Sequence, residues 1–145
     1  MFKIESIHPV SLPVRNKQAS ESFYEEVLGL KKIERPAFGF DGAWYQLGDR
    51  QLHLICHDRS TFREGKPLDS RDIHFAVRIT SFRETKDFLL SKGYSEQPQD
   101  EAKRMKINLP GPDRPPWPQI YIIDPDGNVI ELNAERDDSN DDVSP

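Results

Sequence analysis

Short runs of alternating or β-branched residues recur along this chain, and two longer stretches repeat apolar residues at helical spacing. The longer stretches, residues 16–30 and 81–93, predict helices. Ser81 and Glu84 have the spacing of a capping box at the start of the second helix. The short runs predict strands, which cover residues 6–14, 30–35, 42–48, 50–57, 72–79, 104–109, 119–124 and 128–132. The pattern therefore predicts an α+β protein.

The order of these elements is repeated. Each half of the chain has a strand, then a helix, then about three strands. The repeat period of roughly 65 residues is too long for a solenoid and suits two copies of one small module. We expect a single domain over residues 1–133, with its first module at about 5–58 and its second at about 72–133.

Two segments fall outside this pattern. The stretch "PGPDRPPWP" (110–118) contains five prolines. It is either a rigid connection between strands or the rim of a pocket, with Trp117 facing a ligand. Residues 134–145 are acidic and almost free of apolar side chains, so we expect a disordered tail.

Composition narrows the class of protein. The net charge of −5 and the sequence pI near 5.4 argue against a nucleic-acid partner, which calls for a basic face. The single cysteine excludes an internal disulfide and suits a reducing compartment. We find no signal-peptide pattern at the start and no apolar run of membrane-spanning length. We expect a cytoplasmic protein with no membrane partner.

Superposition of the two halves aligns the residues that carry coordination chemistry. His8 and His74 each lie third in the strand that opens a module, and His53 aligns with Glu131 in the strand that closes it. Any one histidine is more often a hydrogen-bonded structural residue, but four such residues at equivalent positions favour a metal site. Imidazole nitrogens with one carboxylate suit Zn, Ni, Co, Fe or Mn better than Ca or Mg.

Four sequence motifs carry a resemblance to a known family. They are "SIHPVSLPVRNKQASESFYEEVLGL", "FDGAWYQLGDRQLHLI", "IHFAVRI" and "DPDGNVIELN". Over residues 5–133 the chain resembles the vicinal oxygen chelate superfamily, often labelled glyoxalase/bleomycin resistance/dioxygenase. The resemblance implies paired βαβββ modules whose sheets curl into an open barrel around one divalent metal. It implies the ligands His8, His53, His74 and Glu131, and a homodimer.

The resemblance also suggests an activity on a small-molecule substrate. The chain is most similar to glyoxalase I, a lyase that moves a proton next to a metal-chelated carbonyl. In that comparison Glu131 is both a ligand and the catalytic base. His53 departs from the pattern, because glyoxalase I typically has a carboxylate or glutamine there; a histidine can ligate or shuttle a proton. The first strand has Leu12 and Pro13 where glyoxalase I commonly carries an arginine for glutathione.

Other activities of the superfamily stay open. His8, His74 and Glu131 also match the two-histidine, one-carboxylate set of Fe(II) extradiol dioxygenases. A methylmalonyl-CoA-type epimerase, a fosfomycin-type thiol transferase and a bleomycin-resistance-like binding protein are further alternatives. Strand parity and proximity in sequence select the candidate substrate-binding residues, among which Arg78 would anchor an anionic group. The candidates are Gln46, Gln51, Arg78, Trp117 and Tyr121. Trp44 is expected in the core.

Overall fold

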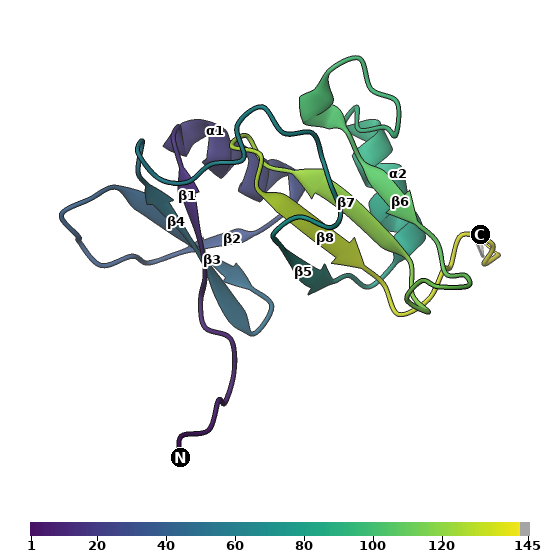
Figure 1. Ribbon diagram of the computed structural model, residues 1–145, viewed down its shortest axis with the longest axis horizontal. Coiled ribbons are helices and arrows are strands. Elements are labelled where there is room, and N and C mark those ends of the chain that lie inside the picture. The colour runs from purple at the N-terminus through teal and green to yellow at the C-terminus, as the bar shows by residue number, and fades with distance from the viewer. Residues whose placement is uncertain (143–145) are drawn as a thin grey trace. The chain divides into compact units, whose positions relative to one another are not determined.

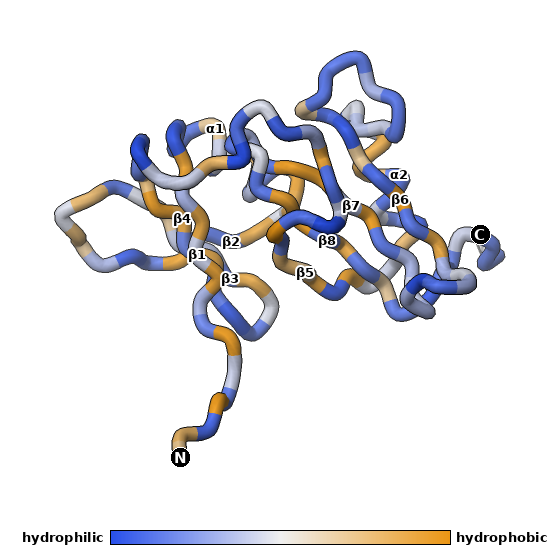
Figure 2. Tube along the Cα trace, viewed as in Figure 1, coloured by the Kyte–Doolittle hydropathy of each residue, from blue (hydrophilic) through white to orange (hydrophobic). Residues whose placement is uncertain are grey.

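The computed structural model describes residues 1–142, which form two compact units that divide between Arg63 and Glu64. The division falls in the stretch between the two predicted modules. Figure 1 shows the elements of both units. Figure 2 shows that hydrophobic residues concentrate along the strands, whereas most connecting loops are hydrophilic.

The first unit contains a strand, a helix and three further strands. Its elements are β1 (Val10–Val14), α1 (Lys17–Ser22), η1 (Phe23–Val27), β2 (Lys31–Ile33), β3 (Gly42–Leu47) and β4 (Arg50–Cys56). The strands form a four-stranded sheet in the order β1-β4-β3-β2. β1 pairs with β4 in parallel, and the other neighbours pair antiparallel. The helical connection between β1 and β2 allows this parallel pairing of the first and last strands.

The second unit repeats the same topology. Its elements are β5 (His74–Arg78), α2 (Phe82–Ser91), η2 (Glu101–Lys103), β6 (Lys106–Asn108), β7 (Gln119–Ile123) and β8 (Val129–Asn133). The sheet order is β5-β8-β7-β6, again with a parallel pair between the first and last strands. The predicted α+β class and the two βαβββ modules are therefore confirmed.

The core of each unit comes from alternate residues of its central strands. In β4, Leu52 and Leu54 are fully buried, while His53 between them points to the other face and is half-buried. In β8, Ile130 and Leu132 are buried on either side of Glu131. Burial of one such aliphatic side chain contributes about 1.5–3 kcal/mol relative to exposure. This alternation directs the candidate site residues away from the aliphatic core of each module.

The structure corrects two details of the prediction. The first helix is shorter than expected, because α1 ends at Ser22 and continues as a π-helical turn in which consecutive Phe23 and Tyr24 are both buried. The first strand begins at Val10, so His8 lies outside it and is exposed. Pro9 follows His8 and has no N–H to extend the ladder.

The acidic segment after β8 also differs from the expected disorder. Ala134 is buried, and the Asp138 carboxylate accepts hydrogen bonds from Ser81 Oγ at 2.6 Å and from the Arg83 N–H at 2.8 Å. These bonds join the segment to the first turn of α2. The rest of the predicted tail, residues 143–145, lies outside the described residues. Over residues 1–142, the longest helices are too short or too polar to span a bilayer.

Candidate metal centre

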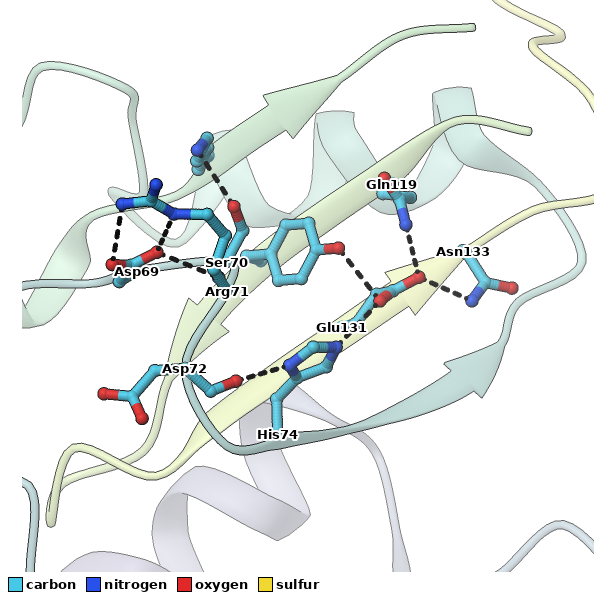
Figure 3. Close-up of polar contacts among 10 residues, drawn as sticks. Asp69, Ser70, Arg71, Asp72, His74, Gln119, Glu131 and Asn133 are labelled. Carbon is cyan, nitrogen blue, oxygen red and sulfur yellow. Dashed lines mark hydrogen bonds and ion pairs between the residues drawn. The ribbon is translucent and has the colours of Figure 1, made fainter. Parts of the chain in front are cut away.

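Glu131 lies in the middle of β8 with only 6% of its surface exposed, and its carboxylate has four polar partners (Figure 3). Oε1 accepts from Gln119 Nε2 and from Asn133 Nδ2, each at 2.9 Å. Oε2 accepts from the Tyr121 hydroxyl at 2.9 Å and lies 3.2 Å from His74 Nε2. Three donors and the adjacent imidazole thus surround the buried charge, which lowers the cost of burying it.

The register of β7 and β8 creates this arrangement. Tyr121 is directly opposite Glu131, and Gln119 is directly opposite Asn133. Residues two apart on a strand point to the same face, so these four side chains share one face of the sheet. The parallel neighbour β5 adds His74 to the same face, because Ala76 pairs with Glu131 and His74 is two residues before it.

The hydrogen bonds fix the protonation of the carboxylate and the phenol. Burial by itself raises the pKa of Glu131, but the hydrogen bonds from Asn133, Gln119 and Tyr121, with the nearby His74, lower it below its ordinary value. Burial, together with the hydrogen bond to Glu131, raises the pKa of Tyr121. At neutral pH the pair is a carboxylate that accepts and a phenol that donates.

The imidazole of His74 is oriented by the backbone. Its Nδ1 lies 2.7 Å from the carbonyl oxygen of Asp72, which only accepts, so Nδ1 carries a hydrogen (Figure 3). Its other nitrogen, Nε2, faces Glu131 Oε2. A histidine whose other nitrogen donates to a backbone carbonyl is the usual arrangement of a metal-ligating histidine.

His53, in the first unit, has a different environment. Its Nε2 is 2.9 Å from the Gln51 side-chain oxygen, and its ring stacks on Trp44 with centroids 3.8 Å apart and planes 4° apart. Burial lowers the pKa of His53, with smaller electrostatic contributions from His8 and Arg35. The ring is therefore neutral at pH 7, and His8 is close enough to influence it electrostatically.

The other sequence candidates divide into two groups. Gln46 donates to the backbone oxygens of Gly48 and Arg50 at 2.6 and 3.1 Å, so its amide holds the β3–β4 hairpin. Arg78 and Trp117 contact each other, with the guanidinium carbon 5.6 Å from the ring centroid. These two residues, from β5 and the proline-rich loop, are adjacent within the second unit.

The predicted four-ligand set is thus present as two pairs, each within its own unit. Glu131 and His74 are in direct contact, and His8 acts electrostatically on His53. Over residues 1–142, no three histidine, cysteine, aspartate or glutamate side chains form a metal-ligand cluster.

A family model described as the Glyoxalase/Bleomycin resistance protein/Dioxygenase superfamily matches residues 6–132. The chain belongs to this superfamily. Its members typically bind a divalent metal and act on small molecules.

Individual superfamily members are distant from this chain. Glyoxylase I 4 of Arabidopsis thaliana is 25% identical over 132 residues, covering 89% of this chain and 70% of that protein. A crystal structure assigned to the glyoxalase family from Bacillus anthracis has a TM-score of 0.68 at 21% identity, covering 92% of this chain and 98% of the other. Lactoylglutathione lyase from Agrobacterium tumefaciens has a TM-score of 0.61 at 18% identity, with 91% and 95% covered. These two likenesses concern the fold.

The residues present fit the divalent metal of the superfamily. His74 Nε2 and Glu131 Oε2 are 3.2 Å apart, close to the spacing of about 3 Å between adjacent ligands when each metal–ligand bond is about 2.1 Å. An imidazole nitrogen beside a carboxylate is also the set of ligand atoms that suits Zn, Fe, Co, Ni or Mn.

Sequence reasoning missed the residues that surround these candidates. Gln119 and Asn133 are buried beside Glu131, and Trp44, expected in the core, covers His53. Gln119 and Asn133 could have been found, because a cross-strand pair of amides in an otherwise apolar hairpin has the same parity as Glu131. The carbonyl of Asp72 had no signal in the sequence.

Proposed function

We propose that this protein is a divalent-metal-dependent, glyoxalase I-like lyase or isomerase that transfers a proton next to a carbonyl group of a small substrate. One observation carries the proposal: a buried, ionised Glu131 lies beside the oriented Nε2 of His74. A carboxylate placed inside a sheet with an oriented imidazole nitrogen facing it has the chemistry of a ligand pair.

His74 and Glu131 would hold the metal, and His8 and His53 stay the sequence-based candidates for further ligands. The metal would act as a Lewis acid that polarises the substrate carbonyl. Glu131 and His53 are the candidates for moving the proton, and both are unprotonated at neutral pH. Arg78 beside Trp117 would bind an anionic part of the substrate. Gln51 supports this proposal through its contact with His53, whereas Gln46 is no longer a candidate for the substrate.

Metal content and activity of the purified protein test the proposal. Wild type, prepared without chelator, would be compared with the His74→Ala and Glu131→Gln variants by elemental analysis, and assayed on adducts of methylglyoxal with glutathione and with other thiols. His57→Ala is the matched control, because His57 is the histidine outside the candidate set. We expect metal and activity in wild type and the control, and loss of both in the two site variants.

Three other outcomes would change the assignment. A wild-type protein without metal would contradict the proposal and favour a small-molecule binding protein. Bound iron with oxygen uptake on catechols would favour the dioxygenase. Bound metal without activity on any thiol adduct would support the proposed metal centre and contradict the proposed reaction. The homodimer and the cytoplasmic location stay predictions, which sedimentation velocity and cell fractionation would check.

A further inference from the structure

The two oxygens of the Glu131 carboxylate have different partners. Oε1 receives two amide N–H groups, from Gln119 and Asn133. A carboxylate oxygen has two lone-pair directions, so these amides occupy Oε1 completely. Oε2 receives the Tyr121 hydroxyl, and its second direction faces His74 Nε2. The one direction of the carboxylate that receives neither an amide nor a hydroxyl is therefore the direction of Oε2 that faces His74.

The first module shows that the fold does not require these polar side chains. In its sheet the Trp44–His53 and Gly42–Ile55 pairs occupy the places of Tyr121–Glu131 and Gln119–Asn133. Glycine, tryptophan and isoleucine thus replace the three donors in the same topology. The three polar side chains are therefore a feature of the second module, where the carboxylate of Glu131 lies beside them.

The three donors are also well sheltered from water. Gln119 is 7%, Tyr121 4% and Asn133 9% exposed. Burial of two primary amides is unfavourable unless they are hydrogen-bonded, and apolar side chains of similar volume would pack such a site at lower cost. All three side chains donate a hydrogen bond to the same carboxylate, that of Glu131, and these bonds offset the cost of their burial.

We propose that Gln119, Tyr121 and Asn133 are positioning residues that make Glu131 a one-oxygen metal ligand. The two amides retain Oε1, so that Oε2 alone is presented beside His74. Tyr121 fixes the direction in which Oε2 faces. This inference rests on the proposed metal centre and adds the residues that set its coordination mode.

Titration of chelator-treated protein with Co²⁺ tests the role of the amides. The visible absorption of Co²⁺ reports both its Kd and its coordination, without any need for turnover. We expect Gln119→Ala and Asn133→Ala each to weaken Co²⁺ binding by about 10–100-fold, as loss of an outer hydrogen bond to a ligand typically does. The double variant should also change the band intensity, because Oε1 becomes free to join the coordination.

Matched controls separate this role from general packing. Gln46→Ala removes an amide that donates to backbone oxygens of the β3–β4 hairpin, and it should leave the Kd and the spectrum unchanged. Tyr121→Phe removes a single oxygen atom and keeps the packing. Its matched control is Tyr45→Phe in the first module. That variant removes a hydroxyl that donates to Glu25, also at 2.9 Å.

Each result decides between the proposals. If wild type binds Co²⁺, and the folded amide variants and Tyr121→Phe bind it with the wild-type Kd and spectrum, the positioning role is wrong and the metal centre stands. If wild type binds no Co²⁺, both proposals fail. If the amide variants do not fold, Tyr121→Phe is compared with Tyr45→Phe. A weaker Co²⁺ Kd in Tyr121→Phe alone, at an unchanged melting temperature, would support the positioning role. Equal Kd values in the two variants would contradict it.

Discussion

Trp44 lies flat against His53 across the β3–β4 ladder, with ring centroids 3.8 Å apart and planes 4° apart. The two residues are direct cross-strand partners, and stacking over this distance excludes water from one face of the imidazole. A tryptophan that the sequence assigns to the core thus sets the environment of a candidate ligand.

Replacement of Trp44 by alanine should raise the pKa of His53. Burial is the largest cause of the lowered pKa, so exposure of the ring moves the pKa back toward its ordinary value of 6.5. NMR titration of the imidazole protons would measure the change. Phe88→Ala is the control, since Phe88 is an exposed ring on α2 in the other module and its removal should leave the pKa of His53 where it is. An unchanged pKa in Trp44→Ala would show that the stacking does not control the ring.

Gly42→Ala should destabilise the first module. A Cβ at Gly42 would lie 2.3 Å from the Leu54 carbonyl oxygen, so the β3–β4 ladder must separate locally. We expect a loss of about 1–3 kcal/mol in the free energy of unfolding, as for other overpacked sites. Gly39→Ala, where a Cβ meets nothing within 4 Å, should unfold at nearly the wild-type denaturant concentration. Equal midpoints for the two variants would contradict this account.

Asp138→Ala should weaken the start of α2. The carboxylate accepts from the Ser81 hydroxyl and the Arg83 N–H, and loss of such a cap costs about 1 kcal/mol. The hydrogen bonds from Ser81 and Arg83 lower the pKa of Asp138 from 3.8. The stabilisation is therefore complete above about pH 3.8 and is lost as the pH falls through the lowered value. Denaturant unfolding at pH 7 and pH 3 would measure it. Glu135→Ala, with an exposed side chain in the same segment, is the control.

A bound divalent metal should stabilise the protein through Glu131. At a free concentration of 100 times its Kd, a metal that binds only the folded state adds about 2.7 kcal/mol. Thermal unfolding with and without Zn²⁺ would show a rise in the melting temperature that EDTA reverses. In Glu131→Gln the rise should disappear. A rise of equal size in that variant would place the metal elsewhere.

The site was partly predictable from the sequence. Glu131 was recognisable as a charge between Ile130 and Leu132, and its carboxylate contacts His74 in the structure. The prediction that His8 lies within the first strand was wrong, because the strand was expected to begin at residue 6 and the ladder begins at Val10. Gln46 lies on the strand face that was predicted for it, but its amide donates to a backbone oxygen of the nearby turn. Parity gives the face of a side chain and not its hydrogen-bond partner.

The sequence by itself determined the α+β class, the repeated module and the polar positions within apolar strands. These features follow from local periodicity and turn residues, which act over a few positions along the chain. Only the tertiary structure decided that Gln119, Tyr121 and Asn133 converge on Glu131, that Asp72 orients His74, and that Trp44 covers His53. These contacts depend on the register between strands. A shift of one residue would turn each side chain to the opposite face, and only the packing of the whole module fixes that register.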